Sequence, residues 1–244
     1  MGKFADRFTP RLRNRDASET SARGALRIIS WNLLHRSGAL VGDIAALIEK
    51  KQPDLFLMQE VTGAIEPLPA SVGGQFYTQS WPGRRHGLAV WSRTPLQKPR
   101  AMELPASKLP GKLPTRFAQV FQIADMTIAN VHLSHGQLLN RRQLRLIARA
   151  TEGPTAIIGD YNSLGPVALP GFSDVGPRGS THRAQEIVPF RLDRCMVRKL
   201  HCKHAHTLLR GPSDHRPILL DFNNPGDARP EAYNQSTTQV TELD

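Results

Sequence analysis

The chain alternates short apolar runs with polar segments, and most of the apolar runs have the length of a strand. The runs that predict strands are Leu26–Trp31, Asp54–Met58, Gly87–Ser92, Phe117–Ile123, Met126–Leu133, Thr155–Gly159, Phe190–Val197 and Pro217–Phe222. Two longer segments, Ala39–Lys50 and Gln137–Ala150, predict helices. Many strands with few helices and several hairpin-like pairs are typical of two packed sheets with helices outside them.

Several of the predicted strands end in a polar functional group. These groups are Asn32, Glu60, Asp160, Asn162, Asp214 and His215, with His132 near the end of another run. Buried strands that end in this way present their polar side chains at one edge of a sheet. The set combines hard oxygen ligands for Mg²⁺ with imidazoles for proton transfer and anion stabilisation, so a phosphate ester is the implied substrate.

Asp160 and Asn162 follow the apolar run Ala156–Ile158 and lie two residues apart, so both side chains are expected to reach one pocket. The carboxylate of Asp160 is suited to accept a proton from water, and the amide of Asn162 to hold water or a phosphoryl oxygen. The same four residues, Gly-Asp-Tyr-Asn, are also typical of an Asx turn, and the sequence alone leaves both interpretations open.

Glu60 ends an apolar run, where a carboxylate is costly unless it is hydrated, paired or bound to a metal. Mg²⁺ takes one or two protein carboxylates and keeps several waters. One glutamate supported by the amide of Asn32 is therefore a plausible cage, although each residue alone is also an ordinary polar strand end.

His132 and Asp193 each have an alternative structural interpretation. His132 lies in a run that would suit a buried core histidine, and Asp193 is flanked by arginines with which it would pair. If Asp193 reaches His215 instead, it would orient and charge that imidazole. Asp214 and His215 are adjacent and point in different directions, so we expect Asp214 to face the metal and His215 the phosphate.

Composition limits the class of protein. The 244 residues include 39% hydrophobic residues, which is enough for one core, and the net charge of +11 favours nucleic acid, anionic lipid or phosphorylated metabolites as partners. Two cysteines exclude a disulfide framework. We expect a flexible basic arm over residues 1–24, one domain over 25–222 and a disordered acidic tail over 223–244. Without a recognisable signal or an apolar stretch of membrane-spanning length, a cytoplasmic location is expected.

The ordered motifs resemble those of the endonuclease/exonuclease/phosphatase superfamily, which is related to DNase I. The motifs that carry the resemblance are Ser30-Trp31-Asn32, Leu57–Glu60, Gly87–Arg93, Asn130–Leu133, Gly159–Asn162, Arg191-Leu192-Asp193 and Ser213-Asp214-His215. Each is weak alone, but they occur in the family's order between residues 25 and 222. Asn32 is followed by Leu33-Leu34-His35-Arg36 and not by the Asn-Gly of abasic-site endonucleases, which disfavours a role in DNA repair.

The resemblance implies an α/β fold, a four-layer α/β/β/α sandwich of two mixed β-sheets, with the site at one edge of both sheets. It implies Glu60 as the main ligand of Mg²⁺ or Mn²⁺, supported by Asn32 and Asp214. It further implies that Asp160 aligns or deprotonates the attacking water and that Asn162 holds it or a phosphate oxygen. His215, paired with Asp193, would stabilise charge on phosphorus, and His132 would protonate the leaving oxygen or bind the phosphate.

Three functions follow in order of preference: a Mg²⁺-dependent nuclease of little sequence specificity, a phosphoesterase acting on a phospholipid or small phosphorylated metabolite, and a silent nucleic-acid-binding module. Residues 84–116 are strongly basic and would hold a phosphate backbone, as would the helical stripe of Arg141, Arg145 and Arg149. The segment Phe76–Gly83 is a candidate for base stacking or membrane contact. Cys202, His204 and His206 would share one face of a strand and suggest a weak zinc alternative.

Overall fold

A computed structural model describes residues 25–36, 38–107, 115–184 and 188–223. Most of these residues form two six-stranded sheets. The first sheet has the order β13-β14-β1-β2-β4-β3 and the second β5-β6-β7-β8-β12-β9, while β10 and β11 form a separate pair. The predicted basic arm over 1–24 lies outside the described residues, as does the predicted tail apart from Asn223.

The bounds of the elements agree with most of the predicted runs. The first sheet contains β1 (Ala25–Asn32), β2 (Leu55–Thr62), β3 (Gln75–Ser80), β4 (His86–Ser92), β13 (Cys202–Thr207) and β14 (Ile218–Asn223). The second contains β5 (Arg100–Glu103), β6 (Phe117–Ile123), β7 (Met126–His132), β8 (Thr155–Asp160), β9 (Ser173–Asp174) and β12 (Asp193–Arg198). The remaining elements are α2 (Val41–Lys51), η1 (Gly63–Ile65), α3 (Leu68–Val72), α4 (Gln137–Ala150), β10 (His182–Ala184) and β11 (Val188–Phe190).

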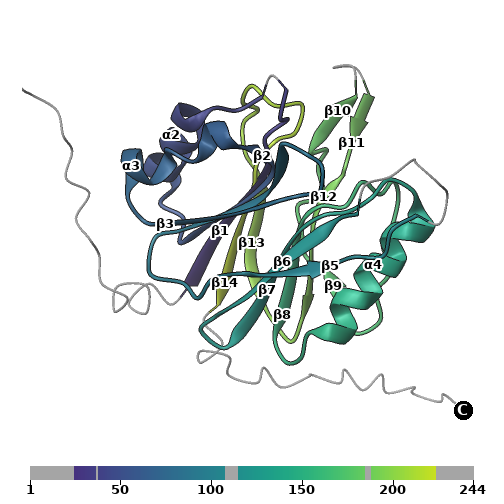
Figure 1. The fold of residues 1–244 in the computed structure, drawn as a ribbon. Helices are drawn as coiled ribbons and strands as arrows, with labels where there is room; N and C mark the ends of the chain where they lie inside the picture. The colour runs from purple at the N-terminus through teal and green to yellow at the C-terminus, as the bar shows by residue number, and fades with distance from the viewer. Residues whose placement is uncertain (1–24, 37, 108–114, 185–187, 224–244) are drawn as a thin grey trace, which may run out of the picture.

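The sheets pack face to face between two layers of helix, as Figure 1 shows with α2 and α3 on one side and α4 on the other. One apolar cluster joins the sheets, a second joins the first sheet to α2 and α3, and a third joins the second sheet to α4. The predicted four-layer sandwich of two mixed β-sheets is therefore confirmed. No helix in the described part of the chain is long and apolar enough to cross a membrane.

Burial on both faces explains why the strands read as continuous apolar runs. Along β1, Ile28 packs between the sheets and Ile29 packs toward the helices. Along β2, Leu57 and Met58 divide in the same way. The pairs β1–β2 and β7–β8 are parallel, so each pair ends at one edge of its sheet. This edge carries the polar groups that follow the runs.

Two predicted features are wrong in detail. The run Phe190–Val197 is not one strand, because β11 ends at Phe190 and β12 begins at Asp193 in the second sheet. Cys202, His204 and His206 do not share a face, because a register shift between Cys202 and His204 turns Cys202 toward the inter-sheet core. The zinc alternative for these three residues therefore loses its geometric basis.

A buried polar network lies between the two sheets around Asn130 of β7. The Asn130 amide nitrogen lies within 3.2 Å of the Met58 carbonyl, 3.1 Å of the Ala89 carbonyl and 3.0 Å of Gln119 Oε1. Its oxygen accepts a hydrogen bond of 2.8 Å from Gln59 Nε2. Asn130 is fully buried, so this motif residue links the sheets and does not face the site.

Replacing Asn130 by Leu is expected to lower the free energy of unfolding by about 3 kcal/mol, because several buried donors and acceptors lose their partner at once. Urea denaturation of the variant and the wild type measures this loss. Gln122→Leu, at an exposed position of β6, is the matched control and should change stability little. A loss below about 1 kcal/mol for Asn130→Leu would contradict a structural role for the network.

Candidate active site

A cavity of about 490 Å³ opens at the edge where β1, β2, β7 and β8 end. All but one of the predicted site residues line it, and Asp193 lies directly behind His215. The lining residues are Asn32, Glu60, Arg116, His132, His135, Gly136, Gln137, Asp160, Asn162, Leu164, His182, Phe190, Leu192, Asp214 and His215. The cavity therefore collects groups from both sheets and from the segments between them.

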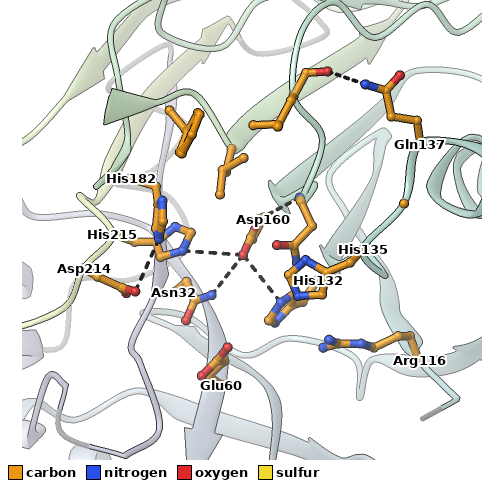
Figure 2. Close-up of a pocket in the computed structure, with 15 residues that line it drawn as sticks. Asn32, Glu60, Arg116, His132, His135, Gln137, Asp160, His182, Asp214 and His215 are labelled. Atoms are coloured by element: carbon orange, nitrogen blue, oxygen red, sulfur yellow. Dashed lines mark hydrogen bonds and ion pairs between the residues drawn. The ribbon is translucent and has the colours of Figure 1, made fainter. Parts of the chain in front are cut away.

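Asp160 is the centre of this arrangement, as Figure 2 shows. Its Oδ2 accepts a hydrogen bond of 3.0 Å from Asn32 Nδ2 and lies 3.5 Å from His132 Nε2 and 3.7 Å from His215 Nε2. The side chain is buried. Burial raises the pKa of the carboxyl above its usual value; Asp193 adds to the rise, and His215 opposes it. A raised pKa suits a carboxylate that takes a proton from water.

The backbone around Asp160 explains the Gly-Asp-Tyr-Asn motif. Gly159 has φ +141°, and a Cβ at this position would lie 2.0 Å from the Val131 carbonyl oxygen, so only glycine lets β8 approach β7 here. Asp160 Oδ1 accepts a hydrogen bond of 2.8 Å from the Asn162 amide, which is the Asx turn. The two interpretations of the motif are compatible, because one carboxylate oxygen closes the turn and the other faces the cavity.

Asp193 pairs with His215 and not with the arginines that flank it in the sequence. Its Nδ1 lies 2.8 Å from Asp193 Oδ2. Burial favours the neutral imidazole, but the negative charges of Asp193 and Asp160 outweigh it and raise the pKa of His215 to about 10. The arginines beside Asp193 in the sequence pair with Asp174 instead. His215 is therefore an imidazolium at neutral pH, with Nε2 directed toward the site.

His132, in contrast to His215, is a neutral imidazole at neutral pH. Burial lowers the pKa of its imidazole well below the usual value, and the positive charges of Arg116 and His215 lower it further. Its ring packs edge-on against Trp81 at a centroid distance of 5.2 Å. A neutral imidazole can donate a hydrogen bond to a phosphate oxygen but is a poor general acid. The lowered pKa of His132 therefore favours phosphate binding over acid catalysis.

Glu60 lies at the other side of the cavity with a partner that the sequence reasoning did not include. Glu60 Oε2 accepts hydrogen bonds from the His35 backbone amide, at 3.2 Å, and from the His35 ring Nδ1. The His35 ring stacks on His86 at 3.9 Å. Burial alone would raise the pKa of Glu60, but the His35 hydrogen bonds outweigh it and lower the pKa, so Glu60 stays ionised.

Arg116 is the most informative residue that sequence reasoning did not single out. Its guanidinium lies 4.0 Å above the Trp81 ring and lines the cavity, yet the side chain is 92% buried, since its exposed fraction is 8%. Burial lowers its pKa, which remains far above neutral. Nη1 is buried without a hydrogen-bond partner among the described residues. A buried guanidinium nitrogen that lacks a hydrogen-bond partner is costly, so this side of the cavity is suited to an anion.

Asp214 and His182 form a pair at the entrance of the cavity. His182 Nε2 lies 3.3 Å from Asp214 Oδ2, and the His182 ring lies 4.5 Å from the His215 ring. Burial favours protonation of Asp214, but the bond from His182 outweighs it and lowers the pKa of the carboxyl. His182 was not predicted, because its short strand β10 carries no apolar pattern.

The donor set fits a divalent metal ion. Oε1 of Glu60 has no hydrogen-bond partner in the described part of the chain, and Asn32 and Asp214 add an amide and a carboxylate oxygen. Hard oxygen donors of this kind are those that Mg²⁺ and Mn²⁺ prefer. Figure 2 shows Asn32 between Glu60 and Asp214. His182, Asp214 and His215 also bring three possible ligand atoms within 4.8 Å of one another.

Comparison with known proteins assigns the chain to one family. The Endonuclease/Exonuclease/phosphatase family model matches residues 29–215, which is most of the chain. The protein therefore belongs to the endonuclease/exonuclease/phosphatase family. Enzymes of this family are generally phosphoesterases that hydrolyse their substrates with the help of a divalent metal ion.

Solved structures resemble the chain in fold. A humanized D. rerio TDP2 is 18% identical, with a TM-score of 0.65, over 82% of this chain and 99% of that one. A functionally unknown conserved protein from Enterococcus faecalis V583 is 19% identical, with a TM-score of 0.66, over 82% and 100% of the two chains. An endonuclease/exonuclease/phosphatase from Beutenbergia cavernae is 18% identical, with a TM-score of 0.65, over 83% and 72%. No curated protein matches by sequence.

Proposed function

We propose that the protein is a Mg²⁺-dependent phosphodiester hydrolase that cleaves nucleic acid with little sequence specificity, through a catalytic domain over residues 25–222. The observation that carries this proposal is the position of Asp160 between Asn32, His132 and His215 in a cavity that is also lined by Arg116, whose Nη1 has no hydrogen-bond partner among the described residues. Nucleic acid is favoured as the substrate by the net charge of +11 and by the exposed arginines along α4.

Glu60, Asn32 and Asp214 would hold the metal, which supplies charge neutralisation at the phosphate when it is bound. Asp160 aligns the attacking water and accepts its proton, for which its raised pKa is suited. Asn162 donates its amide hydrogen to the Leu133 carbonyl at 3.0 Å, which leaves its side-chain oxygen to hold the same water. These residues perform the positioning on which hydrolysis of phosphate esters mainly depends.

Three cationic or hydrogen-bonding groups face the phosphate from the remaining sides of the cavity. The imidazolium of His215, held by Asp193, stabilises the charge that develops on the phosphoryl oxygens. Neutral His132 donates a hydrogen bond to one of these oxygens. Arg116 supplies the second fixed positive charge, and a phosphate would give its Nη1 the hydrogen-bond partner that no described residue provides.

The phospholipid alternative has less support from the described residues. Phe76 packs against the core between the first sheet and its helices, and Trp81 is buried beneath Arg116. Neither is exposed as a membrane-contacting side chain would be. A silent binding module would need none of the Asp160 contacts, so the hydrolase remains the better explanation of the site.

The first experiment measures hydrolysis by the purified protein with Mg²⁺ or Mn²⁺, and with EDTA, on plasmid DNA, single-stranded RNA, a phospholipid diester and an aryl phosphodiester. Metal-dependent cleavage of DNA or RNA that is absent from an Asp160→Ala protein is the expected result. Cleavage of the lipid or the aryl ester alone would retain the chemistry and contradict the substrate. Absence of all activity from a folded protein would contradict the proposal.

Asp193→Asn is expected to shift the alkaline limb of the kcat/KM profile to lower pH by at least about one unit, because an opposite charge at hydrogen-bond distance changes a pKa by about 1–3 units. In the wild type, His215 stays charged up to a pKa of about 10. Activity that requires the charged form is present below this pKa and is lost above it. Initial rates from about pH 5 to about pH 11 test the shift, and an unchanged alkaline limb would exclude His215 as the titrating group.

A further inference from the structure

A second groove, of about 650 Å³, adjoins the active-site cavity. Leu164 and Phe190 line both, so the two hollows are continuous at these side chains. The groove is lined by Leu164, Gly165, Pro166, Val167, Asp174, Arg178, Pro189, Phe190, Arg191 and Arg194. A chain that leaves the active-site cavity past Leu164 and Phe190 would meet the groove.

The walls of the groove are fixed before any ligand arrives. Arg191 binds both carboxylate oxygens of Asp174, at 2.7 and 2.6 Å, and Arg194 binds Asp174 Oδ2 at 3.1 Å. Arg194 also donates to the carbonyl of Gly165 at 2.6 Å. These bonds connect three separate segments of the chain. A groove held in this way loses little conformational entropy when it binds.

The groove is positively charged. Arg178, Arg191 and Arg194 supply three positive charges, and Asp174 supplies one negative charge, so the lining carries a net charge of two. Arg191 and Arg194 pair with Asp174, but Arg178 is exposed, and among the described residues it makes only a long contact of 3.4 Å to the Asp174 backbone carbonyl. Its guanidinium is therefore available to an anionic group of a ligand.

The other side of the groove is apolar. Leu164 is 51% exposed, and Phe190 is half-buried beside the exposed Pro189. The Phe190 ring stacks on His182 at 6.3 Å, which places it at the boundary with the active-site cavity. An aromatic face beside a free arginine is the combination that binds an unpaired base and its phosphate.

We propose that this groove holds the nucleotide next to the scissile phosphate, with its phosphate on Arg178 and its unpaired base on Phe190. Because a paired base has no free face to offer, single-stranded nucleic acid is preferred over a duplex. The inference rests on the proposed function, since the scissile phosphate is placed by the active-site cavity. The charge of the groove favours this occupant over the acyl chain of a lipid, which would need no cation.

The test compares Phe190→Ala, Phe190→Tyr and Arg178→Ala with the wild type. Binding of a fluorescent single-stranded oligonucleotide and its duplex is measured by anisotropy in EDTA, so that no turnover is needed. KM is measured with metal for the oligonucleotide, a short-chain phospholipid diester and an aryl phosphodiester. Lys50→Ala is the charge-matched control, because Lys50 is exposed near the C-terminal end of α2, just before β2 begins.

We expect Phe190→Ala and Arg178→Ala each to raise Kd for the single strand about tenfold, with the duplex little changed. Arg178 lies outside the active-site cavity, so Arg178→Ala should also raise KM for the single strand about tenfold and leave the aryl ester little changed. Phe190→Tyr retains the ring and should behave like the wild type, as should Lys50→Ala. Unchanged binding of the single strand in both alanine variants would overturn the proposal, as would an equal loss for the aryl ester in Arg178→Ala. A change confined to the lipid would assign the groove to an acyl chain. If the wild type does not hydrolyse the aryl ester at all, that result would instead contradict the proposed function, while the anisotropy measurement would still test the groove.

Discussion

Asp160→Asn is expected to reduce kcat by about 10³-fold, within the range that a general base contributes. The carboxylate is the one group that touches Asn32, His132 and His215 together, and an amide in its place cannot accept a proton from water. Initial rates with the aryl phosphodiester at saturating metal measure the loss. KM should change much less than kcat, because in the proposed mechanism Asp160 acts on the water and not on the phosphate.

The same substitution is expected to leave the protein as stable as the wild type or more stable. The folded-state pKa of Asp160 is raised, so the ionised carboxylate opposes folding at every pH above the unfolded-state pKa, and asparagine removes this cost. Thermal denaturation at neutral pH provides the comparison. A variant that retains activity within about tenfold of the wild type would remove Asp160 from the reaction, whereas a large drop in Tm would mean that lost activity reports unfolding.

Arg116→Met is expected to raise KM by about 10- to 100-fold, because a charged hydrogen bond to phosphate contributes about 1.5–3 kcal/mol. Methionine keeps much of the side chain's volume and contacts Trp81 through its sulfur, so the cavity wall is preserved. Stability should fall little, since Nη1 of the guanidinium is buried without a hydrogen-bond partner among the described residues. Substrate titrations and thermal denaturation together measure both effects.

The matched control for Arg116 is Arg100→Met in β5, where the arginine is exposed and does not line the cavity. This variant removes the same charge and should leave KM within about twofold of the wild type at moderate salt. An equal rise of KM in both variants would mean that Arg116 acts only through the overall charge of the protein.

The fold was largely predictable because most strands are buried on both faces, and such strands have uninterrupted apolar sequences. The helix predicted over Gln137–Ala150 has the same bounds as α4, and Phe117–Ile123 the same as β6. The short strand β3, Gln75–Ser80, was missed because its side chains are mostly half-exposed at the edge of the sheet, which leaves no apolar pattern. The prediction of one strand over Phe190–Val197 was wrong because the chain is not in a strand at Arg191, whose side chain pairs with Asp174.

The candidate site was predictable where a residue ends a strand and unpredictable where it lies in an irregular segment. Asn32, Asp160 and Glu60 close or nearly close their strands, and the edge of each sheet then brings them together. Arg116 was counted only as one of many basic residues in 84–116, because its burial over Trp81 depends on tertiary packing. The contact between His35 and Glu60 depends on how the chain turns after β1, which no local pattern specifies.

The docking of the two sheets has a consequence for how the protein loses activity. Asn32 and Glu60 belong to one sheet, while His132, Asp160 and the Asp193 that holds His215 belong to the other. Neither sheet alone carries a complete site, so the candidate site forms only when the two sheets pack against each other. Activity would therefore report the association of the two sheets. A cut between β5 and β6 leaves β14, the partner of β1, on the C-terminal fragment and β5, the partner of β6, on the N-terminal one, so two inactive fragments would regain hydrolysis only as these strand pairs and the inter-sheet core form again.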